Sequence, residues 1–207
     1  MVKDSKQNTK ETGGIIRRSI NTLKAPSSRY SLGFISLTSI FLGILLWGGF
    51  NWALEVTNTE TFCITCHEME EFVYKDYTAS VHNINKTGVR AICSDCHVPR
   101  EWLPKMMRKI QATNELYHKL VGTIDTPEKF EANRLVMAER VWEAMRATDS
   151  RECRNCHSFE SMDFHKQERR AAEKMQKVVD KQTGETCIEC HKGIAHKLPE
   201  GYDEDDD

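Results

Sequence analysis

Four C-x-x-C-H motifs constrain this chain more than any other feature of its sequence. The 207 residues contain eight cysteines, and all eight fall in the motifs Cys63/Cys66/His67, Cys93/Cys96/His97, Cys153/Cys156/His157 and Cys187/Cys190/His191. This motif is the attachment signature of a c-type haem, in which the two thiols form thioethers and the adjacent His can bind the iron. The sequence therefore predicts four covalently bound haem c groups.

Two other uses of paired cysteines fit the pattern less well. C-x-x-C units can hold structural zinc, and eight cysteines can form disulfides in an oxidising compartment. Zinc binding does not explain why a His follows every second cysteine, and disulfides do not explain the constant spacing within each pair. Haem attachment accounts for both features, so we prefer it.

An apolar run of 23 residues, Leu32–Leu54, precedes the first motif. As a helix it would span roughly 34 Å, which exceeds the hydrocarbon core of a bilayer at about 30 Å. The run is too long for the apolar part of a signal peptide, and no A-x-A site follows it. We therefore predict an uncleaved transmembrane anchor over residues 30–54, with the first motif close to the membrane surface.

The distribution of charge predicts the orientation of this anchor. Residues 1–30 contain seven Lys/Arg and two acidic residues, whereas the whole chain has a net charge of -2. Because positive flanks stay in the cytoplasm, we predict a cytoplasmic basic tail at residues 1–29. The haem domain, residues 55–200, and an acidic tail, residues 201–207, would then face the periplasm from a bacterial inner membrane.

The remaining sequence predicts helices and little β structure. Residues 55–99 should contain little regular secondary structure. Residues 100–121 form a basic amphipathic pattern, which fits either a helix on the membrane surface or one that packs on haem. Thr126-Pro127 marks the start of a helix over 127–148, and a third helix is expected near 167–180. The predicted fold is mainly α: one transmembrane helix plus a multihaem domain.

The spacing of the motifs suggests an internal repeat. The first cysteines lie 30 residues apart within the first pair and 34 apart within the second, but 60 apart between the pairs. This spacing predicts two haem-pair modules, about 55–121 and 150–198, joined by the helix 127–148.

The eight histidines divide equally between the motifs and the rest of the chain. The four outside the motifs, which could supply second axial ligands, are His82, His118, His165 and His196. His82 lies 11 residues before Cys93, and the equivalent place before Cys187 is held by Gln176, next to Met175. Met can bind haem iron, so Met175 is a further candidate ligand.

The sequence resembles the NapC/NirT family of membrane-anchored tetrahaem cytochromes over essentially its full length. The residues that carry the resemblance are the anchor, the four motifs, Cys63–Met69 as C-x-x-C-H-x-M, residues 122–128, residues 151–159 (RECRNCHSF) and residues 186–196 (TCIECHKGIAH). The match is closest to the branch that feeds periplasmic nitrate reductase.

The resemblance implies roles for individual residues. Met69 matches a Met that can bind the first haem iron in place of His67. His82 matches a distal ligand of the fourth haem, and His196 one of the third. Lys109 matches a Lys near the quinol pocket of the first haem, and Glu115 is the nearest candidate for an accompanying acid. The second haem is where the sequence departs from the family, with His118, His165 and Met175 all open as its distal ligand.

These features together predict a chain that oxidises menaquinol or ubiquinol in the membrane. Lys109 would hydrogen-bond a quinol oxygen, and Glu115 or His118 would receive a proton. Electrons would pass to a periplasmic reductase, with nitrate reductase as the expected partner. The charge of -7 on residues 53–207, the chain's -2 less the +5 of residues 1–30, suggests a basic patch on that partner.

Two other functions remain open on the sequence alone. The chain could be a passive haem wire that docks to a separate quinol oxidase, or a multihaem reductase of nitrite or a similar oxyanion. Whether it counts as an enzyme depends on this choice: a quinol dehydrogenase or an oxyanion reductase has its own substrate, and a passive electron-transfer protein has none. Nothing in the sequence predicts binding to nucleic acid.

Overall fold

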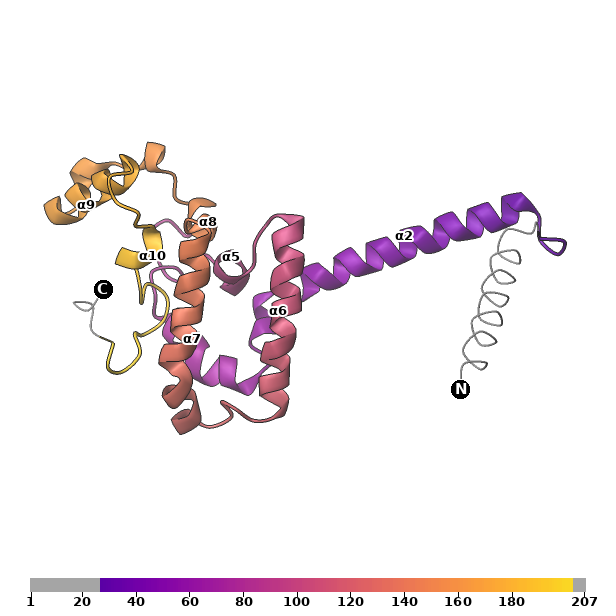
Figure 1. Ribbon diagram of the computed structural model, residues 1–207, viewed down its shortest axis with the longest axis horizontal. Helices are drawn as coiled ribbons and strands as arrows, with labels where there is room; N and C mark the ends of the chain where they lie inside the picture. Colours follow the sequence, from indigo (N-terminus) through magenta and orange to yellow (C-terminus); the bar gives the residue numbers. More distant parts are fainter. Residues whose placement is uncertain (1–26, 203–207) are drawn as a thin grey trace, which may run out of the picture. The chain divides into compact units, whose positions relative to one another are not determined.

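The computed structural model describes residues 27–202 and divides the chain into two compact units, Met1–Ala53 and Leu54–Asp207. Most of the predicted basic tail and most of the acidic tail, residues 1–26 and 203–207, lie outside the described residues. Every regular element among the described residues is a helix (Figure 1). The prediction of a mainly helical fold is therefore confirmed.

The first unit contains, in its described part, most of the helix α2, whose bounds are Leu32–Val56 and whose last three residues belong to the second unit. It has 25 residues, which gives it a length of about 37 Å at a rise of about 1.5 Å per residue. None of its side chains is buried, and in the described part of the chain it is the one helix long and apolar enough to cross a membrane. It occupies the place predicted for the anchor.

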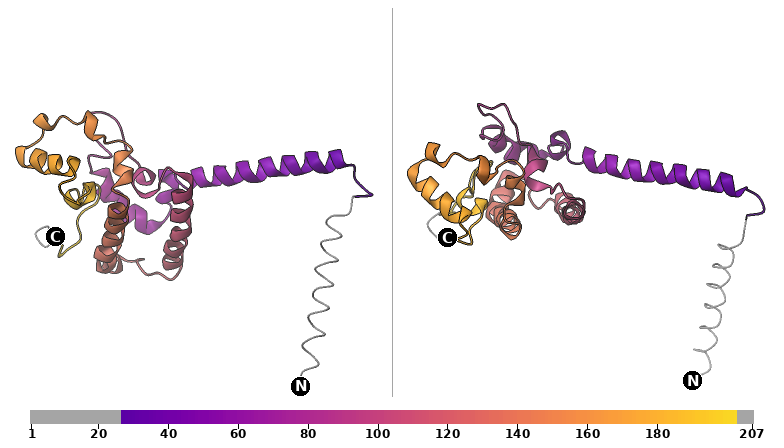
Figure 2. Two further views of the ribbon diagram at one scale, coloured as in Figure 1. Left: turned by 45° about the horizontal axis from the view of Figure 1, so that its top comes forward. Right: turned by 90° about the horizontal axis from the view of Figure 1, so that it is seen from above.

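The second unit is built around the long helices α6 (Trp102–Leu120) and α7 (Pro127–Ala147). They form an antiparallel hairpin, which Figure 2 shows from two further directions. Gly122 allows the tight connection because its φ of +67° is costly for other residues. Thr126 then caps α7, since its side chain accepts a hydrogen bond from the Lys129 backbone N–H at 3.3 Å.

The segment around the first two motifs is more helical than the sequence suggests. It contains four short helices: α3 (Glu60–Cys63), the π-helix η1 (Met69–Tyr74), α4 (Lys75–Thr78) and α5 (Cys93–His97). None is longer than six residues, so none produces a full amphipathic repeat in the sequence. The segment connects the hairpin helices, because Glu68 binds Lys119 of α6 and Phe72 packs on Phe130 of α7.

The chain after α7 carries the last two motifs. Its helices are α8 (Arg151–Arg154), η2 (Phe159–Ser161), η3 (Phe164–Lys166), α9 (Arg169–Val179) and α10 (Cys187–Cys190). The helix α9 lies within the range 167–180 that its sequence predicts, and α10 packs against α7.

The protein core of the second unit is small. The buried apolar side chains in the described part of the chain are Tyr77, Phe130, Trp142 and Ile188. An equal number of polar side chains is buried, namely Glu68, Ser150, Glu152 and Thr186. Because so few apolar side chains are buried, the arrangement of the motifs and histidines decides how this unit is organised.

Candidate haem-binding sites

Each C-x-x-C-H motif lies in or directly after a short helix. The first motif begins at the end of α3, the second forms α5, the third overlaps α8 and the fourth forms α10. All eight cysteines are free thiols, so no disulfide competes with haem attachment. The two thiols and the imidazole of each motif are therefore available as a donor set of the type that c-type haem requires.

The first cysteines of the four motifs make two contacts. The Cys63 and Cys93 thiols share a hydrogen bond, and so do the Cys153 and Cys187 thiols. The hydrogen bond from its partner lowers the pKa of Cys63 to about 7 and that of Cys187 to about 6. In both pairs the contact joins the first cysteine of one motif to the first cysteine of the next.

The second cysteines of the motifs differ from the first in their surroundings. The motif alone does not distinguish its first thiol from its second. Within residues 27–202, however, neither Cys66 nor Cys156 shares a hydrogen bond with another thiol. Cys66 is half-buried near Lys119. Cys156 is exposed near Cys96 of the second motif. The thioethers of all eight cysteines stay predictions that rest on the motifs.

The motif residues do not gather into a metal cluster of the kind that zinc requires. Within the described part of the chain, no group of three or more His, Cys, Asp or Glu side chains is placed to hold a metal ion. Haem differs from zinc in this respect, because the porphyrin supplies four of the iron's ligands and the protein supplies the axial ones. A haem site therefore needs facing axial ligands rather than a cluster.

The second motif of each pair begins with the same carboxylate contact. Asp95 Oδ2 accepts a hydrogen bond from the backbone N–H of Ile92 at 2.9 Å. Glu189 Oε2 accepts one from the backbone N–H of Thr186 at 2.7 Å. The acid stands directly before the second cysteine in both motifs. The second and fourth motifs are therefore alike in how their helices are capped at the start as well as in cysteine spacing.

The two pairs are joined in the order of the sequence. The helix α5 of the second motif contacts α8 of the third. Arg151 of α8 also lies 3.5 Å from Glu101, which directly precedes α6. The four motifs therefore follow one another in space from the first to the fourth.

Two histidines outside the motifs face motif histidines. The ring centroids of His82 and His157 are 6.3 Å apart, and those of His97 and His196 are 6.2 Å apart. Two imidazoles that bind one metal ion from opposite sides, each with a metal–nitrogen bond of about 2.0 Å, have centroids about 6 Å apart. The residues present therefore fit an iron held between each pair of rings.

The electrostatics of the second pair suit this role. Burial, with the neighbouring His196 as the next cause, lowers the pKa of His97 to about 4. Burial also lowers the pKa of His196. Both rings are thus neutral at physiological pH and keep a lone pair for a metal.

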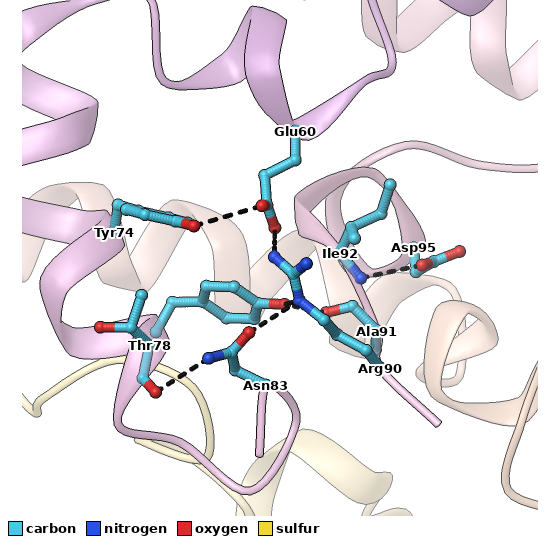
Figure 3. Close-up of polar contacts among 9 residues, drawn as sticks. Glu60, Tyr74, Thr78, Asn83, Arg90, Ala91, Ile92 and Asp95 are labelled. Atoms are coloured by element: carbon cyan, nitrogen blue, oxygen red, sulfur yellow. Dashed lines mark hydrogen bonds and ion pairs between the residues drawn. The ribbon is translucent and has the colours of Figure 1, made fainter. Parts of the chain in front are cut away.

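A network centred on Arg90 holds the loop that carries His82 (Figure 3). The Arg90 guanidinium forms an ion pair with Glu60 of α3. Its Nε donates hydrogen bonds to Asn83 Oδ1 at 2.7 Å and to the Tyr77 hydroxyl at 3.2 Å. Through Arg90, Asn83 is joined to Glu60 of α3 and to Tyr77 of α4. Because Asn83 is next to His82, these contacts limit how far the His82 imidazole can move.

A second network holds His196. The backbone N–H of Lys197 donates to Asp76 Oδ2 at 3.2 Å, and Asp76 also forms an ion pair with Arg134 of α7. Arg134 in turn donates to the Lys197 carbonyl at 2.9 Å. Although burial acts to raise it, the hydrogen bonds from Arg134 and Lys197 hold the pKa of Asp76 below its usual value. The carboxylate therefore stays charged and anchors the C-terminal segment.

The first motif has different surroundings. The His67 ring makes an edge contact with Phe72, with centroids 5.8 Å apart. Glu68, whose side chain is 3% exposed, accepts two hydrogen bonds of 2.6 Å from Lys119. Met69 is half-buried and begins the π-helix η1. The Glu68–Lys119 contact thus fixes the turn between His67 and Met69, the two candidate ligands of the first iron.

Of the three residues predicted for a quinol site, Lys109 lies beside the first motif. Its Nζ donates to Thr57 Oγ1 at 2.8 Å and to the Thr57 carbonyl at 3.1 Å, and its charge acts on Cys63. Burial lowers the pKa of Lys109. Glu115 instead forms an ion pair of 2.7 Å with Arg108, and His118 lies 3.0 Å from Thr123 Oγ1.

Comparison with known proteins agrees with this donor set. The pattern of the "NapC/NirT cytochrome c family, N-terminal region" matches residues 25–201. The chain belongs to the NapC/NirT cytochrome c family. It is therefore a c-type cytochrome, and the resemblance noted from the sequence is confirmed.

Individual relatives cover nearly the whole chain. The chain is 56% identical to the denitrification system component NirT of Stutzerimonas stutzeri, over 99% of this chain and 98% of the relative. It is 52% identical to the cytochrome c-type protein NapC of Escherichia coli K12, over 93% and 95% of the two chains. It is 50% identical to the cytochrome c-type protein NapC of Haemophilus influenzae, over 90% of both chains. No solved structure matches the chain.

The histidine pairs differ from the ligand assignment that the family resemblance implies. The resemblance assigns His82 to the fourth haem and His196 to the third, but the structure places His82 against the third motif and His196 against the second. His196 therefore occupies the place for which His118, His165 and Met175 are the sequence candidates. His165 is exposed in η3, and Met175 is half-buried on α9.

Several residues that organise this family member are not identified from its sequence. Arg90, Asp76, Glu68 and Ser150 lie outside the cysteines and histidines of the motifs, and each joins segments far apart in the chain. The one local signal is at Glu68, which stands between two candidate iron ligands. The others could be found only from contacts in the folded chain.

Proposed function

We propose that this cytochrome is anchored in the bacterial inner membrane, oxidises quinol beside its first motif and delivers electrons to a periplasmic reductase. The observation that carries this proposal is the order of the motifs. The first begins seven residues after the end of α2 and has Lys109 beside it, and the other three follow in sequence order, with α5 of the second in contact with α8 of the third. Haem c, when bound, accepts and releases one electron at a time.

The four motifs would hold the haems through their eight thiols. We infer that His97 and His196 bind the second iron, and that His157 and His82 bind the third. Met69 or His67 binds the first iron, and His191 binds the fourth. This assignment is supported by the spacing of the facing rings and by the neutral state of His97 and His196.

Lys109 would position the quinol. A half-buried ammonium group that donates hydrogen bonds can also donate to a quinol oxygen, and the lowered pKa makes it easier for the group to release or exchange a proton. Glu115 and His118 are both candidates for the acceptor of the quinol protons. The Glu115 carboxylate is exposed and pairs with Arg108, and His118 directly precedes Lys119 of the Lys119–Glu68 pair.

The orientation of the anchor follows from charge. The basic stretch before α2 would stay in the cytoplasm and the haem-bearing unit would lie in the periplasm. Periplasmic nitrate reductase is the acceptor that the family resemblance suggests. The NirT relative is described as a denitrification system component, so a denitrification reductase is the other candidate acceptor. Mixing the reduced cytochrome with each enzyme and following its reoxidation distinguishes the two acceptors.

Quinol oxidation is tested with Lys109→Gln in the purified full-length protein. Menadiol is added anaerobically, and haem reduction is followed by stopped-flow absorption. We expect the reduction rate to fall about tenfold, the effect of losing one charge-assisted hydrogen bond. Reduction by dithionite should stay unchanged.

Lys105→Gln is the matched control. Lys105 lies one turn earlier on α6 and pairs with Glu55 at 3.1 Å rather than with the residues beside Cys63. It should retain the rate of the unsubstituted protein. If both variants oxidise menadiol normally, Lys109 has no part in the site, and if the unsubstituted protein is not reduced by menadiol, the protein is not a quinol dehydrogenase.

A further inference from the structure

The helix α9 carries an exposed row of cations beside the fourth motif. Residues 166–181 contain six Lys/Arg and three Asp/Glu, although the chain as a whole has a net charge of -2. Arg170, Lys174, Lys177 and Lys181 are spaced four, three and four residues apart, and all are exposed. At this spacing Arg170, Lys174 and Lys177 share one face of α9, and Lys181 follows two residues after the helix ends at Val179. We call these four residues the α9 basic stripe.

The charges of this stripe are not neutralised within the protein. In residues 27–202 the ion pairs of the region are Arg169–Glu173 at 2.9 Å and Lys166–Asp163 at 3.4 Å, and neither involves a member of the stripe. Four cations that face solvent without a carboxylate partner repel one another and attract an external anionic surface. The stripe therefore has the charge pattern of an interaction surface.

The stripe lies next to the last motif of the series. The helix α9 ends at Val179, eight residues before Cys187 begins the fourth motif, and Lys174 acts electrostatically on the Cys190 thiol of that motif. In all three views α9 lies at the outer edge of its unit (Figures 1 and 2). A protein that docked on the stripe would therefore sit beside the site at which the proposed electron path ends.

The apolar face of α9 is turned inward, which argues against lipid as the occupant. Ala172, Met175, Val178 and Val179 are all half-buried, and residues 166–181 expose no large apolar side chain. A helix that lies in a membrane interface needs an exposed apolar face as well as cations. The stripe offers charge alone, which fits the polar, electrostatically complementary surface of a soluble protein.

We propose that the α9 basic stripe is the docking surface for the electron acceptor, a soluble redox protein with acidic side chains around its metal centre. This inference rests on the proposed direction of electron flow. The charge of -7 on residues 53–207 suggests a basic partner. For the surface formed by the α9 basic stripe, the proposed partner is an acidic one. Each encounter transfers one electron that quinol has supplied, and the acceptor's metal centre is reduced by one unit.

The test uses two acceptors of opposite charge. The full-length protein in phosphatidylcholine nanodiscs is reduced with dithionite, which bypasses quinol, and mixed with plastocyanin, an acidic copper protein, or with mitochondrial cytochrome c, a basic one. We expect R170E/K174E/K177E to slow reduction of plastocyanin about tenfold at low salt and to speed reduction of cytochrome c. High salt should remove both effects.

Two single substitutions form a matched pair. Lys177→Glu and Lys86→Glu make the same change of charge at exposed lysines, but Lys86 lies in the loop between the first two motifs. Only Lys177→Glu should slow plastocyanin reduction. All variants should keep four haems per chain and the normal rate of reduction by menadiol, so a folding defect or a failure of quinol oxidation would be recognised separately.

Three results would overturn the proposal. The triple variant could reduce plastocyanin at the normal rate, or Lys86→Glu could slow it as much as Lys177→Glu does. The third result concerns lipid. If nanodiscs that contain phosphatidylglycerol slowed the unsubstituted protein but not the triple variant, the stripe would bind anionic lipid rather than an acceptor.

Discussion

Ser150 is a single residue that joins the third motif to the fourth. It is 0% exposed and has a left-handed φ of +47° directly before α8. Its Oγ lies 2.8 Å from Thr186 Oγ1 and accepts a hydrogen bond from the backbone N–H of Ile188 at 3.2 Å. One hydroxyl thus connects the starts of two haem-binding helices that are far apart in the sequence.

Replacing this hydroxyl should destabilise the haem domain. Ser150→Ala removes the acceptor of the Ile188 N–H, and the buried donor that is left unpaired costs about 1–3 kcal/mol. The backbone cost at the left-handed φ is shared by Ser and Ala, so the difference reports the hydroxyl. Urea unfolding followed by circular dichroism measures the effect.

Ser158→Ala provides the comparison for this prediction. Ser158 is exposed, and its substitution should change the free energy of unfolding by less than about 0.5 kcal/mol. Equal stabilities of the two variants would show that the Ser150 hydroxyl contributes nothing.

At the scale of residues, the sequence identifies donors but not the groups that hold them. The eight cysteines and four motif histidines follow from spacing alone, because attachment chemistry fixes that spacing. The spacing does not reveal that Cys66 and Cys156 lie apart from the thiol contacts that join the first cysteines. Ser150 and Asp76 look like ordinary polar residues until segments 36 and 121 positions away contact them.

At the scale of elements, the turn between α6 and α7 offers a sharp prediction. Gly122 has a φ of +67°, and a Cβ there would lie 2.7 Å from Asp125 Oδ2. That carboxylate forms an ion pair of 2.7 Å with Lys129. Gly122→Ala therefore combines backbone strain with displacement of Asp125, and should lower the free energy of unfolding by about 1–2 kcal/mol.

Gly88 separates these two effects. Its φ is +73°, but a Cβ at that position would meet no atom within 4 Å. Gly88→Ala should therefore show only the backbone cost of about 1 kcal/mol. Urea unfolding of the two variants checks this, and a Gly122→Ala protein as stable as the unsubstituted one would contradict it.

Helices could be predicted where the sequence is long enough to show a period or a cap. The helices α6, α7 and α9 have 19, 21 and 11 residues, and their apolar positions or the Thr126-Pro127 start reveal them. The short helices of the segment 55–99 escape prediction, because four to six residues cannot display a period of 3.6. Their formation depends on contacts such as Arg90–Glu60, which no local pattern encodes.

At the scale of the whole haem domain, the two histidine pairs connect its halves. His82 comes from the first half and faces the third motif, while His196 comes from the last segment and faces the second motif. The contacts between first cysteines lie within each predicted motif pair, whereas each facing pair of histidines joins the two halves. A comparison of the two halves of the sequence matches each position with its equivalent in the other half. Such a comparison cannot reveal that a histidine of one half faces a motif of the other.

This crossing leads to a prediction about electron flow. His82→Met should replace one of two facing imidazoles with a thioether, and a His/Met iron has a higher potential than a His/His iron. A redox titration should show one haem raised on the order of 100 mV, with the other three unchanged. Because the third motif lies between the second and the fourth, the raised site would retain its electron. Menadiol should then still supply the first electrons at the normal rate, while steady transfer to plastocyanin slows.

Ile84→Met adds a thioether at an exposed position of the same loop and should change neither the four potentials nor the rate of transfer to plastocyanin. A His82→Met protein whose four potentials all match those of the unsubstituted protein would show that His82 does not bind iron.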